Sequence, residues 1–348
     1  MPRTARHPLK MALEAPPPPK ALTVTTIVYI PALAGYWEEG LNILKLFVRS
    51  VYKNTSQPFD LVVLDNGSCP EVLEYLIELK NKGDIQSLIL SHKNLGKTRA
   101  LNLLLKAAPG RFVTYADSDV YFLPGWFEST ERVFNTFPKA GKVTAMASVM
   151  NTYSEFFSQF FDYALRDAQT DPSITIRMGE IVPDDLLNAH RLSLGESSEQ
   201  YQVRIQPRRD IQIEKMDCQA LISGVDFQFT ISRAALDAIL PLEAEKSLIA
   251  GDAIYTPILE QRLAENGYWQ LSTTGYFVHH LGNHIPEFDK ELPWLAAEDL
   301  PVIDPEMLLR TRTADKQQNK IAYRIIHNRF IRKFLKKVHL VSYRLLYE

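Results

Sequence analysis

Two carboxylates stand one residue apart in the triplet Asp117-Ser118-Asp119, which directly follows the apolar run RFVTYA. A pair of acids in a turn after a strand can bind a hard divalent cation, and such a cation can bridge the oxygens of a diphosphate. The same triplet also forms an ordinary Asx-type turn at the end of a strand. Taken alone, the triplet leaves both a metal site and a structural turn open.

A second candidate is the segment NLGKTRALN, which spans residues 94–102. Gly96 permits a close approach of the backbone, and Lys97 adds positive charge at the start of an expected helix, where the helix dipole already favours anions. The segment lacks the longer glycine-rich run of the phosphate loop of nucleotide hydrolases. The alternative is a capped helix with a solvated lysine.

A histidine pair and a late acid complete the set of candidates. His279 and His280 end a β-like run and precede Leu281 and Gly282. One imidazole could join the acids around a metal, and at most one can do so, because adjacent strand residues point to opposite faces. A surface or hydrogen-bonded histidine is the alternative. Asp252 stands at an expected helix start, where an acid is also a common N-cap.

Strands and helices alternate regularly in the first third of the chain. The patterns predict strands over 24–30, 59–65, 85–90 and 111–116, and helices over 41–54, 69–83 and 97–108. Such alternation favours a parallel sheet covered by helices, and ligands bind at the carboxyl ends of its strands. Residues 150–217 predict an amphipathic helix followed by irregular or hairpin structure. Beyond them we expect a strand over 221–232, helices over 234–240 and 252–267, and a strand or strand pair over 268–280.

Composition limits the function classes. The 348 residues include 39 basic and 41 acidic ones, and 46% are hydrophobic, which is an ordinary globular balance and excludes a collagenous or wholly disordered chain. The net charge of -2 gives no basic footprint for nucleic acid. Cys69 and Cys218 form no disulfide framework, so we expect a reducing, cytoplasmic location. The proline-rich segment 1–22 has no apolar core typical of a secretory signal and is expected to be a disordered leader.

The tail has a different character. Residues 320–348 carry eight basic side chains and one acidic one, Glu348, with apolar residues at helical spacing. This pattern predicts a basic amphipathic helix within a C-terminal extension, 286–348. The helix could lie on an anionic membrane at its cytoplasmic face, or dock on the rest of the chain or on a second subunit of a homodimer.

The order of these features is more informative than any one of them. In chain order, the features are a strand ending at Pro31, the turn Asp65-Asn66-Gly67-Ser68, the segment N-x-G-K-x-x-A-L-N, a strand leading into DSD, an acid before a helix and then H-L-G. This order resembles that of the GT-A-fold nucleotide-sugar glycosyltransferases, more narrowly the inverting glycosyltransferase family 2. The resemblance runs over roughly 24–283. It implies an α/β, GT-A-type fold, with a Rossmann-like, mostly parallel sheet and helices on both faces. The implied catalytic domain spans 23–285, with a nucleotide-binding half, 23–120, and an acceptor-binding half, 121–285.

The resemblance also implies roles for particular residues. Asp65 would contact the nucleotide base and Lys97 the nucleotide or diphosphate. The implied metal is Mn²⁺ or Mg²⁺, with Asp119 and Asp117 as ligands and His280 preferred to His279, because H-L-G-N better matches the family pattern. Asp252 falls where the family places its general base. The remaining implied nucleotide-sugar-binding residues are Pro31, Asn94, Gly96, Asn102 and Ser118.

Two departures from the family pattern bear on the base. Gly251 stands where the family has an acid, and the interval from Asp252 to Arg262 is about one helical turn longer than usual, so Asp226 and Glu260 are substitutes for the base. The chain also lacks the Gln-x-x-Arg-Trp motif and the membrane spans of processive synthases.

The expected function is that of a non-processive, metal-dependent, inverting glycosyltransferase. Its donor would be a nucleoside-diphosphate sugar, and its acceptor a hydroxyl of a glycan, a lipid-linked molecule or a small molecule. One alternative is a nucleotidyltransferase, which would normally show an early glycine-rich loop with basic residues, whereas IPALAGYWEEG has neither Lys nor Arg. The other is a non-catalytic protein that binds a nucleotide-sugar.

Overall fold

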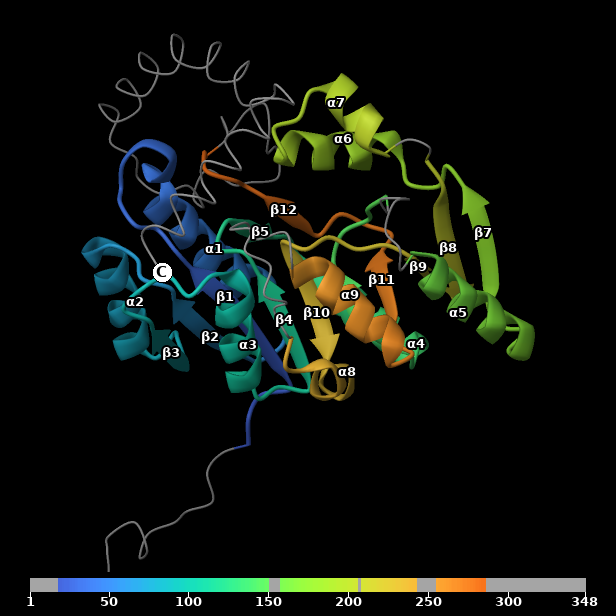
Figure 1. Ribbon diagram of the computed structural model, residues 1–348, viewed down its shortest axis with the longest axis horizontal. Helices are drawn as coiled ribbons and strands as arrows, with labels where there is room; N and C mark the ends of the chain where they lie inside the picture. The colour runs from blue at the N-terminus through green and yellow to red at the C-terminus, as the bar shows by residue number, and fades with distance from the viewer. Residues whose placement is uncertain (1–17, 150–156, 206–207, 243–254, 286–348) are drawn as a thin grey trace, which may run out of the picture.

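The computed structural model describes residues 18–149, 157–205, 208–242 and 255–285 (Figure 1). Nearly all of the predicted leader, Asp252 and the predicted amphipathic tail therefore lie outside the described residues. None of the described helices combines the length and the apolar character needed to span a membrane.

The N-terminal half is a parallel four-stranded sheet whose strands alternate with helices. The elements are β1 (Leu22–Val28), α1 (Gly40–Asn54), β2 (Phe59–Asp65), α2 (Pro70–Lys82), β3 (Ser87–Leu90), α3 (Lys97–Ala107) and β4 (Phe112–Ala116), with a short 3-10 helix, η2 (Gly35–Trp37), after β1. The strand order is β3-β2-β1-β4. Every strand and helix predicted for this half from the periodicity is present.

Local sequence explains where these helices begin and end. Pro70 occupies the first turn of α2, where its missing N–H costs no hydrogen bond. Gly83 ends the helix in the left-handed conformation at φ 88°, and its N–H donates to the carbonyls of Leu79 and Lys80. These boundaries set the lengths of the connections that place the strand ends along one edge.

The sheet continues beyond β4 as a mixed sheet. The full order is β3-β2-β1-β4-β10-β6-β11-β9-β8-β7, in which β10 is antiparallel to both β4 and β6, while β6 and β11 are parallel. The added strands are β6 (Ala140–Thr144), β7 (Thr175–Gly179), β8 (Asp210–Lys215), β9 (Cys218–Leu221), β10 (Gln228–Ser232) and β11 (Trp269–Thr273). The predicted α/β class is confirmed, and its parallel character is concentrated in the N-terminal half.

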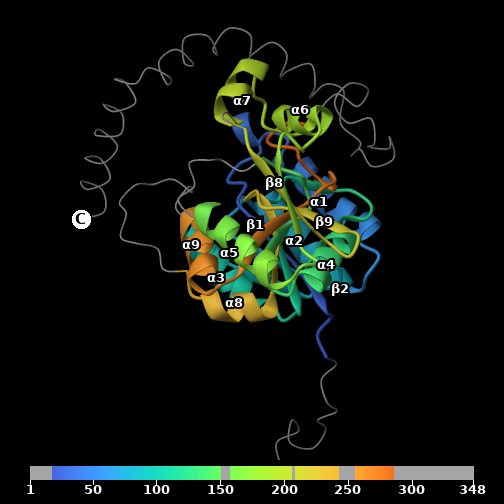
Figure 2. The ribbon, with the colours of Figure 1, turned by 90° about the vertical axis from the view of Figure 1, so that its right-hand side faces the viewer.

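Helices cover both faces of this sheet. Seen close to edge-on, α3, α5, α8 and α9 lie on one side, and α2 and α4 on the other (Figure 2). The additional helices are α4 (Trp126–Thr136), α5 (Phe157–Thr170), α8 (Arg233–Ile239) and α9 (Tyr255–Glu265). One apolar core joins the elements of both halves, from Leu22 and Val63 to Ile231 and Leu271.

Two smaller features lie above the carboxyl edge of the sheet in Figure 1. A two-stranded antiparallel sheet pairs β5 (Val120–Phe122) with β12 (Val278–His280). The helices α6 (Asp184–Ser193) and α7 (Ser198–Ile205) share a small apolar cluster with Ala147 and Leu221. The sequence predicted irregular or hairpin structure here. The β8–β9 hairpin fits that prediction, whereas α6 and α7 do not.

Candidate functional site

Two loops at the carboxyl edge of the parallel strands are tied together by side-chain amides. The Nδ2 of Asn66 donates to the Oδ1 of Asn94 over 3.0 Å, and the Oδ1 of Asn66 accepts from the N–H of Leu95 over 2.9 Å. The Oδ1 of Asn94 also accepts from the N–H of Gly96 over 2.7 Å. These bonds place the loop after β2 beside the loop that leads into α3.

Gly67 shows how closely the two loops approach each other. Its φ is 90°, and a Cβ built there would lie 3.1 Å from the backbone of Lys93. A side chain at this position would therefore meet both conformational strain and main-chain atoms. Next to it, Asp65 is buried, and its Oδ1 accepts from the N–H of Ser68 over 3.1 Å. Asp65 thus caps the turn after β2.

The first acid of the DSD triplet is held by a lysine and a tyrosine. The Nζ of Lys97 lies 2.9 Å from the Oδ1 of Asp117, and the hydroxyl of Tyr115 donates to that same oxygen over 2.5 Å. The Lys97 ammonium also lies 5.6 Å from the centre of the Tyr115 ring. Burial raises the pKa of the Asp117 carboxyl, Lys97 opposes this rise, and the charge of Asp119 adds to it. A cation bound here would favour the ionised form.

The second acid meets a histidine from the far end of the domain. In the β5–β12 pair, His280 lies opposite Val120, the residue after Asp119. The main chain adds a bond of 2.7 Å from the N–H of Leu281 to the carbonyl of Asp119. As a result, the Nε2 of His280 lies 3.2 Å from the Oδ2 of Asp119. A strand pairing, rather than a local motif, creates this contact.

Asp117, Asp119 and His280 together form the acid–histidine cluster, in which one ligand atom from each residue lies within 4.8 Å of the others. The Oδ1 of Asp119 is buried and has no hydrogen-bond partner among the described residues. A buried carboxylate oxygen without a partner is costly unless a cation or another donor satisfies it. Two carboxylates and one imidazole suit Mn²⁺ or Mg²⁺, so the residues present fit such an ion.

His279 points to a different environment. Its Nδ1 lies 2.7 Å from the hydroxyl of Tyr276, and its side chain is buried. Burial lowers the pKa of His279 to about 4, and the charge of His280 contributes to this decrease. The geometry thus places His280, and not His279, in the cluster.

Part of the chain matches a known protein family. Residues 33–179 match the family described as Glycosyl transferase family 2. The chain is 28% identical over 109 residues to an uncharacterized glycosyltransferase of Haemophilus influenzae, a match that covers 31% of this chain and 32% of that protein. Residues 33–179 are thus similar to a family 2 glycosyltransferase domain. The chain spans about a third of the length of this curated relative.

Solved structures match a larger part of the chain at lower identity. The mannosyltransferase PcManGT of Pyrobaculum calidifontis, solved with GDP-Man and Mn²⁺, is 15% identical, with a TM-score of 0.41 over 76% of this chain and 58% of that one. GalNAc-T7, solved with UDP, GalNAc and Mn²⁺, is 12% identical, with a TM-score of 0.45 over 75% of this chain and 44% of that one.

The segment that matches family 2 contains the predicted donor-side residues from Asp65 to Asp119, whereas His280 lies beyond its end.

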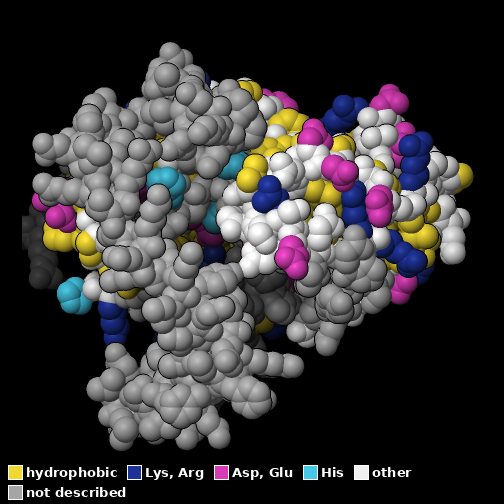
Figure 3. All heavy atoms as spheres, turned by 90° about the horizontal axis from the view of Figure 1, so that it is seen from above, with side chains coloured by type: hydrophobic (Ala, Val, Ile, Leu, Met, Phe, Trp, Pro, Cys, Tyr) yellow, Lys and Arg dark blue, Asp and Glu magenta, His cyan; other side chains and the backbone are white. Residues whose placement is uncertain are grey.

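Seen from above, histidine side chains lie beside acidic and basic side chains at the carboxyl edge of the sheet (Figure 3). Pro31 is exposed just after β1. Ser118 lies between the two acids and is half-buried.

Three residues that help to build the site were missed by the sequence reasoning. Tyr115 stands two residues before Asp117 and thus on the same side of its strand, so alternation could have identified it. Phe227 carries the carbonyl that accepts the N–H of Asp117 over 2.8 Å, and its ring lies 5.1 Å from that of His280. Asn66 joins the two loops. No local signal identifies Phe227, because its contacts depend on the pairing of β10 with β4.

Other candidates have different surroundings. The amide of Asn102 pairs with the main chain of Leu242, donating to its carbonyl over 2.7 Å and accepting from its N–H over 2.8 Å. Asn102 therefore joins α3 to the chain after α8. Among the substitutes for Asp252, Glu260 accepts from Gln270 over 3.0 Å, and Asp226 lies 3.4 Å from the Nζ of Lys142.

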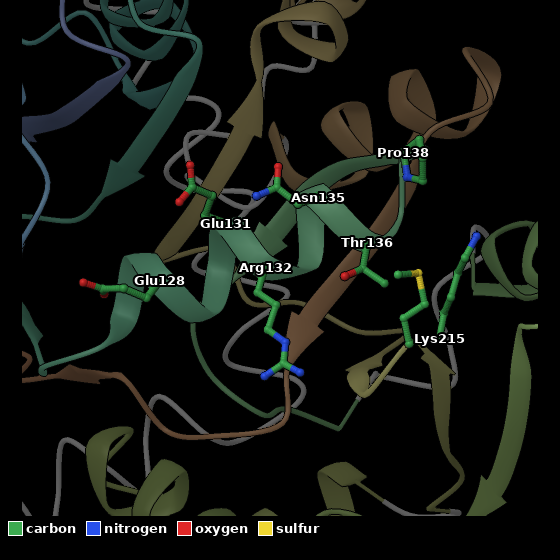
Figure 4. A pocket seen from close by; sticks show the side chains of 8 residues that line it. Glu128, Glu131, Arg132, Asn135, Thr136, Pro138 and Lys215 are labelled. Atoms are coloured by element: carbon green, nitrogen blue, oxygen red, sulfur yellow. The ribbon is translucent and has the colours of Figure 1, made fainter.

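A separate open cavity of about 570 Å³ lies between α4 and the turn that joins β8 to β9 (Figure 4). Glu128, Arg132 and Lys215 line it, and it shares no residue with the acid–histidine cluster. This cavity therefore plays no part in the candidate site.

Proposed function

We propose that this chain transfers one sugar from a nucleoside-diphosphate sugar to an acceptor hydroxyl, with a divalent cation and with inversion at the anomeric carbon. The observation that carries the proposal is the acid–histidine cluster, which lies at the carboxyl edge beside Lys97 in a chain that matches glycosyltransferase family 2 over residues 33–179. Ligands of α/β sheets bind at this edge.

On the donor side, Asp119 and His280 would hold the cation, and Asp117 would bind it while paired with Lys97. When bound, Mn²⁺ or Mg²⁺ neutralises charge that develops on a diphosphate leaving group. Lys97 adds a fixed positive charge at the start of α3, where anions are already favoured. Asp65, with the loops tied by Asn66 and Asn94, would bind the nucleoside.

On the acceptor side, a carboxylate would accept the proton of the attacking hydroxyl. Asp252 is our assignment for this base, and Asp226 and Glu260 are the substitutes. A single attack from the face opposite the leaving group inverts the anomeric carbon. The acceptor, whether a glycan, a lipid-linked molecule or a small molecule, would bind through residues of the 121–285 half.

Ligand-dependent thermal stability tests the donor and the cation together. The full chain is heated with UDP, GDP, ADP, CDP or dTDP, each with Mn²⁺, with Mg²⁺ or with EDTA. A ligand that binds only the native state raises the midpoint, with about 2.7 kcal/mol gained at a concentration of 100 Kd. We expect one nucleotide to stabilise the chain in the presence of the cation and to lose most of this effect in EDTA. No stabilisation by any nucleotide would contradict the proposal.

A second experiment separates transfer from binding. The sugar forms of the stabilising nucleotide are incubated with candidate acceptors, and NMR determines the anomeric configuration of the product. A product of opposite configuration to the donor is expected. Formation of a nucleotide-sugar from a nucleoside triphosphate would instead indicate a nucleotidyltransferase, and binding without turnover of any donor would indicate a non-catalytic protein.

For the predicted tail, we propose an interfacial location on an anionic, cytoplasmic membrane surface. The support is the charge of residues 320–348, which include eight basic side chains and one acidic side chain. Each basic residue near such a surface contributes roughly 1 kcal/mol. Sedimentation with vesicles containing phosphatidylserine compares the full chain with a chain ending before Gln318. Equal binding of both, or no binding at low salt, would contradict the membrane location and favour docking on protein.

A further inference from the structure

A fully buried lysine lies beside the candidate site. Lys142 is in β6, and its side chain is 0% exposed. Its ammonium lies 5.1 Å from the centre of the Phe229 ring and 3.4 Å from the Oδ1 of Asp226. A buried ammonium requires a compensating charge, and Asp226 is the carboxylate that supplies it within the described residues.

The Asp226 carboxylate lies at the same edge as the acid–histidine cluster. Asp226 precedes β10, which runs antiparallel to β4, so the start of β10 lies at the carboxyl end of β4. The next residue, Phe227, accepts the N–H of Asp117 through its carbonyl over 2.8 Å and packs on the ring of His280. The side chain of Asp226 is 41% exposed, so a ligand at this edge can reach it.

The charge of this group limits what it can bind. The Asp226 side chain, as a carboxylate, is only a hydrogen-bond acceptor. It repels phosphate oxygens, which in the proposed function bind to the cation and Lys97. Hydroxyl groups, by contrast, donate to it, and neighbouring hydroxyls of a sugar ring can donate to its two oxygens. Asp226 therefore suits the uncharged, hydroxyl-rich part of the donor.

We infer that Asp226, held by the buried Lys142, accepts hydrogen bonds from hydroxyl groups of the transferred sugar and so contributes to the choice of sugar. This inference rests on the proposed function. Lys142 is a positioning residue, because it acts through Asp226. The role differs from that of a base: a sugar-binding carboxylate changes the affinity for the donor, whereas a base changes the catalytic constant.

Calorimetry in Mn²⁺ tests the inference by comparing a free nucleotide with its sugar form. The probes are UDP with UDP-hexoses and GDP with GDP-hexoses, and the pair used is the one whose nucleotide stabilises the wild type. Asp226→Asn should weaken binding of the sugar form about 10–100-fold, as expected for loss of a hydrogen bond to a charged group. It should leave the affinity for the free nucleotide within about twofold of wild type.

Two further variants keep the test decisive. Lys142→Met retains the length and apolar stem of the side chain and should cause the same selective loss, provided its near-UV circular dichroism matches that of the wild type. Asp171→Asn is the matched control, because Asp171 pairs with Lys215 over 2.7 Å and is 37% exposed, but contacts neither the cluster nor its loops. It should bind both probes as the wild type does.

The possible outcomes are distinguishable. Wild-type affinity of Asp226→Asn for the sugar form, or an equal loss for both probes, would overturn the inference. Unchanged affinity with a catalytic constant lowered at least about 100-fold would overturn it too and make Asp226 the base. If the wild type binds no nucleotide at all, the proposed function itself fails.

Discussion

Two regions of the large sheet are built in different ways. From β1 to β4, a helix after each of the first three strands returns the chain to the same edge. From β10 to β9, sheet neighbours are far apart in sequence, and β10 inserts between β4 and β6. Residues in the first region are therefore positioned by repeated strand–helix units, and those in the second region by long-range pairing.

This contrast matters because the candidate site takes residues from both. Lys97, Asp117 and Asp119 come from the local units, whereas His280 and Phe227 arrive through the pairings of β12 with β5 and of β10 with β4. The residues proposed to bind the cation and the nucleotide thus come mainly from the first region, and the second region completes the set. The predictions below test that division.

The largest effect is expected for Asp119→Ala. Removing this carboxylate takes one ligand from the cluster, so we expect loss of cation-dependent nucleotide binding and no detectable cation-dependent turnover, while the fold is retained. The measurements are nucleotide titrations with Mn²⁺ and circular dichroism. Asp237→Ala, which removes an exposed acid in α8, is the control. Wild-type turnover of Asp119→Ala in the presence of a chelator would show that no metal acts at this position.

Asp252→Asn is expected to lower the catalytic constant by about 10²–10⁴-fold, which is the typical contribution of a general base. Donor affinity should stay nearly unchanged, since the base acts on the acceptor. Steady-state kinetics at saturating donor, together with calorimetry, separate the two. Unchanged turnover would move the role to Asp226 or Glu260, and would extend the catalytic contribution of the long-range region.

Two asparagines of the β1–β4 region have hydrogen-bond partners in different regions. Asn66→Ala removes the acceptor of the Leu95 N–H and should cost about 1–3 kcal/mol of unfolding free energy while also weakening nucleotide binding. Asn102→Ala removes both partners of the Leu242 main chain and should cost a similar amount.

Nucleotide affinity distinguishes these two variants. For Asn102→Ala we expect nucleotide affinity to remain at the wild-type level, because the side chain of Asn102 bonds to Leu242, which lies after α8. Urea unfolding and nucleotide titration of both variants give the answer. A loss of affinity in Asn102→Ala would restore the nucleotide-supporting role that the family resemblance implied.

The smallest effect concerns the ion pair at the outer end of the sheet. Hydrogen bonds from Lys215 and Ser173 lower the pKa of Asp171 to about 2. Because the pKa is lower in the folded state, the pair stabilises the fold above the ordinary carboxyl pKa of about 4, and this contribution is lost as the pH falls towards 2. The thermal midpoint of Asp171→Asn should lie slightly below that of the wild type at pH 6, and the difference should disappear near pH 2. A constant difference would contradict this.

The same contrast explains how much could be predicted from the sequence. The β1–β4 elements, the turn after Asp65 and the placement of Lys97 and the DSD acids follow from periodicity, turn chemistry and the rule that strand ends meet at one edge. The choice of His280 over His279 required the register of β12 against β5. Phe227 and Lys142 have no local signal, since each acts through neighbours that are distant in sequence.

The helices α6 and α7 were not predicted for a similar reason. Their apolar residues, such as Leu187, Tyr201 and Ile205, pack in a small cluster of their own with Ala147 and Leu221. Short helices with few apolar positions give a weak periodic signal, so tertiary packing decides their structure.

The pairing of β12 with β5 also sets an order of events during synthesis. A chain is made from its N-terminus, so both acids leave the ribosome before His280 does. Until then the cluster has only two of its three ligands. Full affinity for a cation would therefore appear only when residues 278–280 have docked, and cation binding would report that the domain is complete.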